Sequence, residues 1–113
     1  MRHRTAAVLV LAGASLALAA APAPGQTRTL RATVGPGFTI TLTPKPTKPG
    51  RYTLVVSDRS PIHNFHLRGP GVNVKTSVPG QGRKTFTITL RKGLYTYVCD
   101  PHAASMRGSF RIR

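Results

Sequence analysis

The sequence holds a single cysteine, Cys99, and a histidine and a methionine follow it at His102 and Met106. A thiolate, an imidazole and a thioether at this spacing can all reach one metal ion from a tight loop. A further histidine, His63, lies upstream. One cysteine, two histidines and a weak methionine ligand form the trigonal donor set that suits copper in electron transfer. The sequence therefore predicts a copper site at which Cys99, His102 and Met106 are joined by a histidine of the segment 62–67, His63 or His66.

The elements that must position these ligands are all expected to be strands. Short runs of Thr, Val, Ile, Phe and Tyr alternate with polar residues, and Gly and Pro interrupt them. The runs 38–42 and 86–90 have the period of two that gives a strand one apolar and one polar face. No segment keeps a helical period, so we expect one all-β domain, an antiparallel sandwich. Strands are expected over 28–34, 37–43, 51–57, 62–68, 72–77, 84–91, 94–99 and 107–112.

Strand alternation helps to choose between the two upstream histidines. On a strand over 62–68, His63 shares the face of the apolar residues, whereas His66 points the other way. On the strand over 94–99, the inward row ends at Cys99. Because both inner rows can end at the same pole of a sandwich, His63 is the expected ligand. We expect His66 to be a structural histidine, and Asn64 to tie the two segments together beside the metal.

These residues resemble the cupredoxins, or type 1 blue copper proteins, nearest the plastocyanin and pseudoazurin group. The resemblance covers most of residues 28–113. It implies a Greek-key β-sandwich of seven or eight strands and a one-electron carrier rather than an enzyme. It also implies one copper ion held by His63, Cys99 and His102, with Met106 as the axial ligand, and a tyrosine that supports the neighbouring corner. The matching motifs are His63-Asn64, Gly93-x-Tyr95-x-Tyr97-x-Cys99-x-Pro101-His102 and Met106-x-Gly108-x-Phe110-x-Ile112.

Two departures from the family pattern bear on how electrons would leave the site. Val98 stands where plastocyanins have a tyrosine, and the whole chain has only 2 acidic residues. An acidic remote port for electrons is therefore not expected. The edge of His102, among Ala103 and Ala104, is the expected exit. In addition, the loop from His102 to Met106 is one residue shorter than in plastocyanins.

The N-terminus has the pattern of a secretory signal peptide. Arg2 and Arg4 precede an uncharged, apolar run from Thr5 to Ala21, and small residues follow. The run is short for a membrane span, which needs about 20 residues. We expect residues 1–23 to be a signal peptide, cleaved somewhere in 19–26, and residues 24–113 to form the single domain. The protein would then be periplasmic or extracellular, or membrane-associated if the segment is retained.

The charge is strongly positive, and it bears on the choice of partner. There are 17 Lys and Arg against 2 Asp and Glu, a net charge of +15, or +13 without Arg2 and Arg4. Such a field attracts acidic proteins and, weakly, anionic membranes. The charges are spread singly and aromatic residues make up only 6% of the chain, so no specific binding of nucleic acid is expected. We expect a monomer whose redox partner is acidic at its docking surface.

The same residues could also serve other functions. A protein that buffers or delivers copper would use the same ligands, so this alternative stays open. A zinc hydrolase would need a carboxylate base, and Asp58 and Asp100 each lack a second acid as partner. A nucleophilic Cys99 would need a substrate cleft, for which a small all-β shell leaves little room. We therefore do not expect an enzyme.

Overall fold

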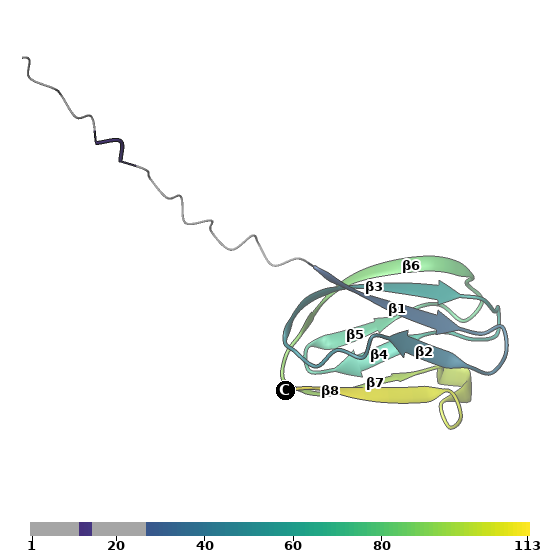
Figure 1. The fold of residues 1–113 in the computed structure, drawn as a ribbon. Helices are drawn as coiled ribbons and strands as arrows, with labels where there is room; N and C mark the ends of the chain where they lie inside the picture. The colour runs from purple at the N-terminus through teal and green to yellow at the C-terminus, as the bar shows by residue number, and fades with distance from the viewer. Residues whose placement is uncertain (1–11, 15–26) are drawn as a thin grey trace, which may run out of the picture.

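The computed structural model describes residues 12–14 and 27–113. The expected signal peptide 1–23 and its cleavage window 19–26 lie outside the described residues, apart from residues 12–14. Two four-stranded sheets face each other (Figure 1). One sheet has the strand order β2-β1-β3-β6, built from β1 (Arg28–Val34), β2 (Ile40–Thr43), β3 (Gly50–Asp58) and β6 (Gly82–Leu90). The other has the order β5-β4-β7-β8, built from β4 (His66–Gly69), β5 (Val72–Lys75), β7 (Gly93–Val98) and β8 (Arg107–Ile112).

The predicted all-β sandwich of eight strands is confirmed, with one difference in strand direction. All paired strands are antiparallel except β1 and β3, which run parallel from Arg28 opposite Tyr52 to Val34 opposite Asp58. β2 is antiparallel to β1 and pairs with one of its edges. β3 follows β2, runs back in the direction of β1 and pairs with the other edge. The expectation of a purely antiparallel sandwich is wrong at this pair.

Two strands begin later than the sequence pattern predicts. β2 begins at Ile40 instead of residue 37, because the turn Gly35-Pro36-Gly37 precedes it. Phe38 was expected on the apolar face of that strand, yet its side chain is 63% exposed. β4 begins at His66 instead of residue 62, so His63 lies in the connection after β3. Among the described residues, no helix is long and apolar enough to cross a membrane.

The core lies between the sheets, and aromatic pairs fill much of it. Tyr95 stacks on Phe110 with ring centroids 5.1 Å apart, and Phe65 stacks on Tyr97 at 5.6 Å. The ring of Tyr95 lies against Gly69, where a Cβ would collide with it. Packing of this kind gives the strands a fixed spacing and register.

The hydroxyl of Tyr95 closes the corner before β7. It accepts a hydrogen bond from the Arg91 amide at 3.0 Å and donates to the Pro70 carbonyl at 2.9 Å. The supporting role that the resemblance implied for Tyr95 is therefore confirmed. This corner fixes the start of the strand that ends at Cys99.

Candidate metal centre

Three side chains converge at one end of the sandwich, as the sequence predicted. The Nδ1 atoms of His63 and His102 are 3.1 Å apart, and they lie 3.7 and 3.5 Å from the Cys99 Sγ. A point equidistant from atoms with these separations lies about 2 Å from each, which is a metal–nitrogen bond length. Among the described residues, this trio is the one cluster of His, Cys, Asp or Glu able to hold an ion.

Main-chain hydrogen bonds hold two of these donors in a compact loop. Cys99 directly follows β7, and the 3₁₀ turn Asp100–His102 brings the next imidazole back toward the sulfur. The His102 amide donates to the Cys99 carbonyl at 3.0 Å. Met106 then closes the loop, because its carbonyl accepts from the Cys99 amide at 3.0 Å and its amide donates to the His102 carbonyl at 2.8 Å. These main-chain hydrogen bonds thus define the shape of the loop.

Met106 forms part of the apolar wall of this end. It is buried, and it packs in a small cluster with Val34 and Cys99, against the half-buried Ile40. The cluster joins the two sheets, since Val34 and Ile40 belong to the other sheet. A thioether placed in such a wall can serve as a weak axial ligand, as the sequence predicts.

The two histidine rings differ in their exposure. His63 is fully buried, and its Nε2 has no hydrogen-bond partner, whereas His102 is partly exposed. Phe38 packs edge-on against both rings, at centroid distances of 5.1 and 5.0 Å. With Ile62, which is 51% exposed, and Ala103, Phe38 gives this end an apolar surface. The strand pattern placed Phe38 in the core, so the sequence carried no sign of this position.

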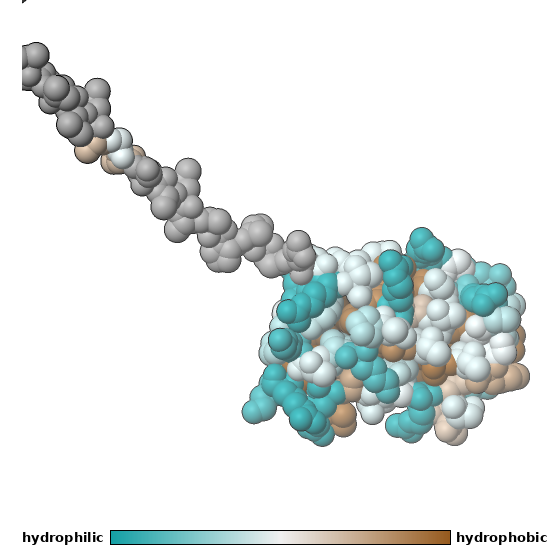
Figure 2. All heavy atoms as spheres, in the orientation of Figure 1, coloured by the Kyte–Doolittle hydropathy of each residue, from teal (hydrophilic) through white to brown (hydrophobic). Residues whose placement is uncertain are grey.

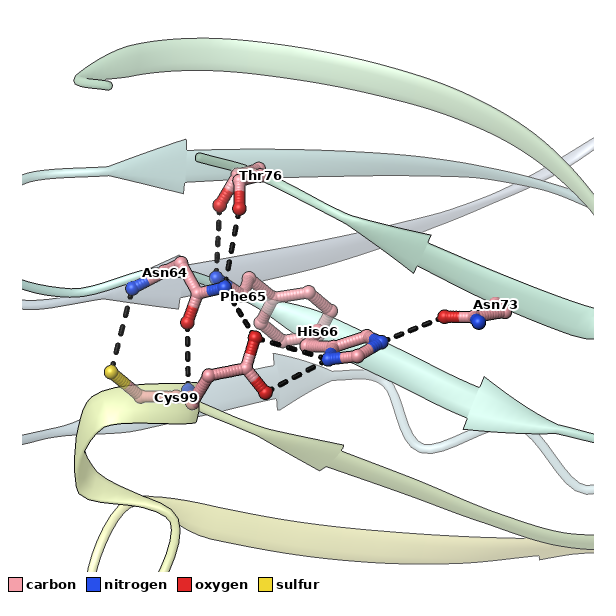
Figure 3. Close-up of polar contacts among 7 residues, drawn as sticks. Asn64, Phe65, His66, Asn73, Thr76 and Cys99 are labelled. Carbon is pink, nitrogen blue, oxygen red and sulfur yellow. Dashed lines mark hydrogen bonds and ion pairs between the residues drawn. The ribbon is translucent and has the colours of Figure 1, made fainter. Parts of the chain in front are cut away.

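Asn64 connects the two ligand segments, as predicted (Figure 3). The main-chain N–H of Asn64 donates to the Cys99 Sγ at 3.4 Å. Its side-chain oxygen accepts from the Asp100 amide at 2.7 Å, and its side-chain nitrogen donates to the Asp100 carboxylate at 2.8 Å and to the Thr76 carbonyl at 3.2 Å. The segments carrying His63 and Cys99 are therefore bound to each other and to the end of β5.

His66 lies outside the donor cluster, as expected, and forms a separate contact that the sequence did not indicate. Its Nδ1 lies 2.9 Å from the Asp100 carboxylate, which accepts from it, and its Nε2 lies 2.7 Å from Asn73 Oδ1. Asp100 follows the ligand cysteine directly. The position of this single acid was the only indication of the contact in the sequence. Which residue it pairs with depends on the strand register.

Both acidic residues lie at the metal end, and their pKa values shift in opposite directions. Burial alone would raise the pKa of the Asp100 carboxyl, but hydrogen bonds from Asn64 and His66 and the charges of His66 and Lys75 outweigh it and lower that pKa. Burial raises the pKa of Asp58, and the hydrogen bond from Ser60 offsets only part of this effect.

More of the exposed Lys and Arg side chains lie at the end of the sandwich opposite the donor cluster. Every described Lys and Arg is exposed. The far end, where β1 and β3 begin and β8 ends, carries Arg28, Arg51, Arg91, Arg111 and Arg113. Figure 2 shows strongly hydrophilic side chains gathered at that end. The molecule is therefore more positive at the end away from the donor cluster.

Comparisons with known proteins agree with this geometry. A model of the family described as copper binding proteins, plastocyanin/azurin family, matches residues 33–113. Reduced rusticyanin is 22% identical, with 79% of this chain and 81% of that chain covered and a TM-score of 0.59. Rusticyanin from Thiobacillus ferrooxidans is 24% identical, with 79% of each chain covered and a TM-score of 0.53. A chain of a heme-copper terminal oxidase dimer is 19% identical, with 79% and 66% covered and a TM-score of 0.56. At these identities the structural likeness shows the fold alone. No curated protein sequence matches the chain.

Proposed function

Because the chain belongs to the plastocyanin/azurin family of copper-binding proteins, we propose that it is an exported type 1 copper protein that carries single electrons between redox partners. Copper is the cofactor of this family, and the proposed ligands are His63, Cys99 and His102, with Met106 in the axial position. The observation that carries the proposal is the convergence of one sulfur and two imidazole nitrogens on a common point.

The chain's own residues are suited to electron transfer because they fix the donor atoms in advance. Copper, when bound, supplies a one-electron couple. The main-chain bonds of the Cys99–Met106 loop, the main-chain N–H of Asn64 and the Asn64 side chain hold the donors. A site held in this way changes little in geometry between two oxidation states. The function would be that of a carrier and not of an enzyme, which accords with a family described as copper-binding proteins.

The surface around His102 is the proposed docking site for the redox partner. The partly exposed His102 ring gives the shortest path from the donor cluster to solvent, and Phe38 and Ile62 surround it with apolar surface. Exposed Arg59 and Arg107 stand at the strand ends nearest this surface. An apolar centre with a positive rim fits a partner protein that is acidic around its own docking patch.

Export is proposed from the N-terminal sequence alone. The run of residues 1–23 would direct the chain to the periplasm or the exterior, or hold it at the membrane if it is retained. The positive end of the sandwich would add a weak attraction to anionic lipids. We propose that the protein works as a monomer.

The absorption spectrum of the copper-loaded chain tests the proposal directly. We expect an intense visible band from thiolate-to-copper charge transfer and a reversible one-electron couple in voltammetry. A colourless Cu(II) complex, or less than stoichiometric copper, would contradict electron transfer. A copper-delivery protein would instead give up its ion readily to a competing protein. The full burial of His63 and Cys99 favours the carrier.

Electron exchange with an acidic partner should slow as the salt concentration rises. The positive field speeds encounter at low ionic strength, and salt screens it over a Debye length of about 10 Å at 0.1 M. Stopped-flow rates at several salt concentrations measure the effect, with an uncharged small-molecule oxidant as the control. Rates that do not depend on salt would show that the charge serves another purpose.

A further inference from the structure

We propose that His66 is a positioning residue for the ligand cysteine. Its ring holds the Asp100 carboxylate, and Asp100 in turn fixes Asn64 so that the Asn64 amide points at the Cys99 sulfur. The inference rests on the proposed function to the extent that Cys99 binds copper. It adds a role for a histidine that is not itself part of the donor cluster.

The first step is the placement of the His66 ring. His66 is buried at the start of β4, and both of its ring nitrogens face acceptors: Nδ1 faces Asp100 and Nε2 faces Asn73 (Figure 3). A carboxylate can only accept, so the ring donates its Nδ1–H to Asp100. It is anchored to β5 through Asn73 on one side and holds the Cys99 loop on the other. The ring therefore has one orientation.

The second step is the contact by which His66 keeps the Asp100 carboxylate in place. Both carboxylate oxygens lie within 3.1 Å of His66 Nδ1, and one of them also accepts from Asn64. The Asp100 side chain is 40% exposed. Without His66 the carboxylate would be better solvated if it turned outward into water. The contact of His66 Nδ1 with both carboxylate oxygens keeps the carboxylate turned inward.

The third step runs from Asp100 to the sulfur. Asp100 binds both ends of the Asn64 amide group, and Asn64 in turn donates its main-chain N–H to Sγ. A donor aimed at an anionic sulfur stabilises its negative charge. This favours the reduced state of a copper–thiolate site, in which the sulfur gives less charge to the metal. Loss of the contact should therefore lower the reduction potential.

The first experiment uses the metal-free full chain. In the wild-type protein, NMR should show a slowly exchanging proton on His66 Nδ1, which faces the Asp100 carboxylate. In His66→Leu, the main-chain amide proton of Asn64 should exchange with solvent about tenfold faster. This factor corresponds to the loss of one hydrogen bond. Arg68→Leu is the matched control, since Arg68 lies on the same strand but is exposed, and it should leave the exchange rate unchanged.

The second experiment uses the copper-loaded chain. His66→Leu should keep its copper and its visible band but have a lower reduction potential than the wild type and Arg68→Leu. Asn73→Leu removes only the outer contact of the ring and should shift the potential in the same direction by less. If His66→Leu does not fold, Asn73→Leu replaces it in this test.

Three results would overturn the inference. These are an Asn64 exchange rate and potential that stay at wild-type values in the folded variants, a wild-type His66 Nδ1 proton that exchanges rapidly, and loss of the visible band in His66→Leu. Failure of the proposed function is distinguishable from failure of this inference. A wild-type chain without a blue band would refute electron transfer, while the metal-free exchange data would still decide the role of His66.

Discussion

Cys99→Ser is expected to abolish the visible band of the copper-loaded protein. The band arises from charge transfer out of a soft thiolate, and a serine hydroxyl is a hard ligand that stays protonated near neutral pH. The substitution is small and leaves an acceptor for the Asn64 amide, which lies 3.4 Å from the sulfur. The fold should therefore persist, as circular dichroism can verify, while absorption and copper stoichiometry report the loss.

His66→Ala is the matched control for this result, because His66 is the other buried histidine. It should keep the band, although its potential should fall as argued above. His63→Ala should lose the band together with Cys99→Ser. The ligand assignment would be wrong if His66→Ala bleached the protein and His63→Ala did not.

Tyr95→Ala is expected to lower the free energy of unfolding by about 3–5 kcal/mol, the usual cost of removing a large aromatic side chain from a core. Tyr95 has no exposed surface, stacks on Phe110 and fills the space above Gly69. Chemical denaturation of the metal-free protein measures the change without any contribution from copper binding.

Two further variants divide this effect into its parts. Tyr95→Phe keeps the ring and loses the hydroxyl bonds to Arg91 and Pro70, so it should cost about 1 kcal/mol. Leu94→Ala, at a neighbouring side chain that is 51% exposed, should change the stability by no more than about 0.5 kcal/mol. If Tyr95→Ala cost no more than Leu94→Ala, the stacked pair would not support the core.

Much of the fold could be predicted because strand alternation is a local property. The bounds of β1 and β8 agree with the sequence pattern, and so does the burial of Ile88 and Leu90 between exposed threonines. The pattern failed where turns interrupt it. A period of two cannot tell that Phe38 precedes its strand, nor that β1 and β3 are parallel neighbours, since pairing across the sheet is decided by the whole topology.

The site was predictable to the extent that its ligands are close in sequence. Cys99, His102 and Met106 lie in one loop, and the spacing alone indicated them. Strand alternation selected His63, and His63 does join the donor cluster. It lies in the connection after β3 and not on a strand, however, so the argument that selected it does not hold. The pair of His66 and Asp100 could not be foreseen, because it depends on β4 and β7 lying side by side in one register.

The burial of the sulfur also matters before copper arrives. Cys99 is the only cysteine of the sequence and has no exposed surface. Disulfide formation requires a thiolate to reach a second sulfur. Two copies of the folded chain are therefore not expected to become cross-linked through Cys99.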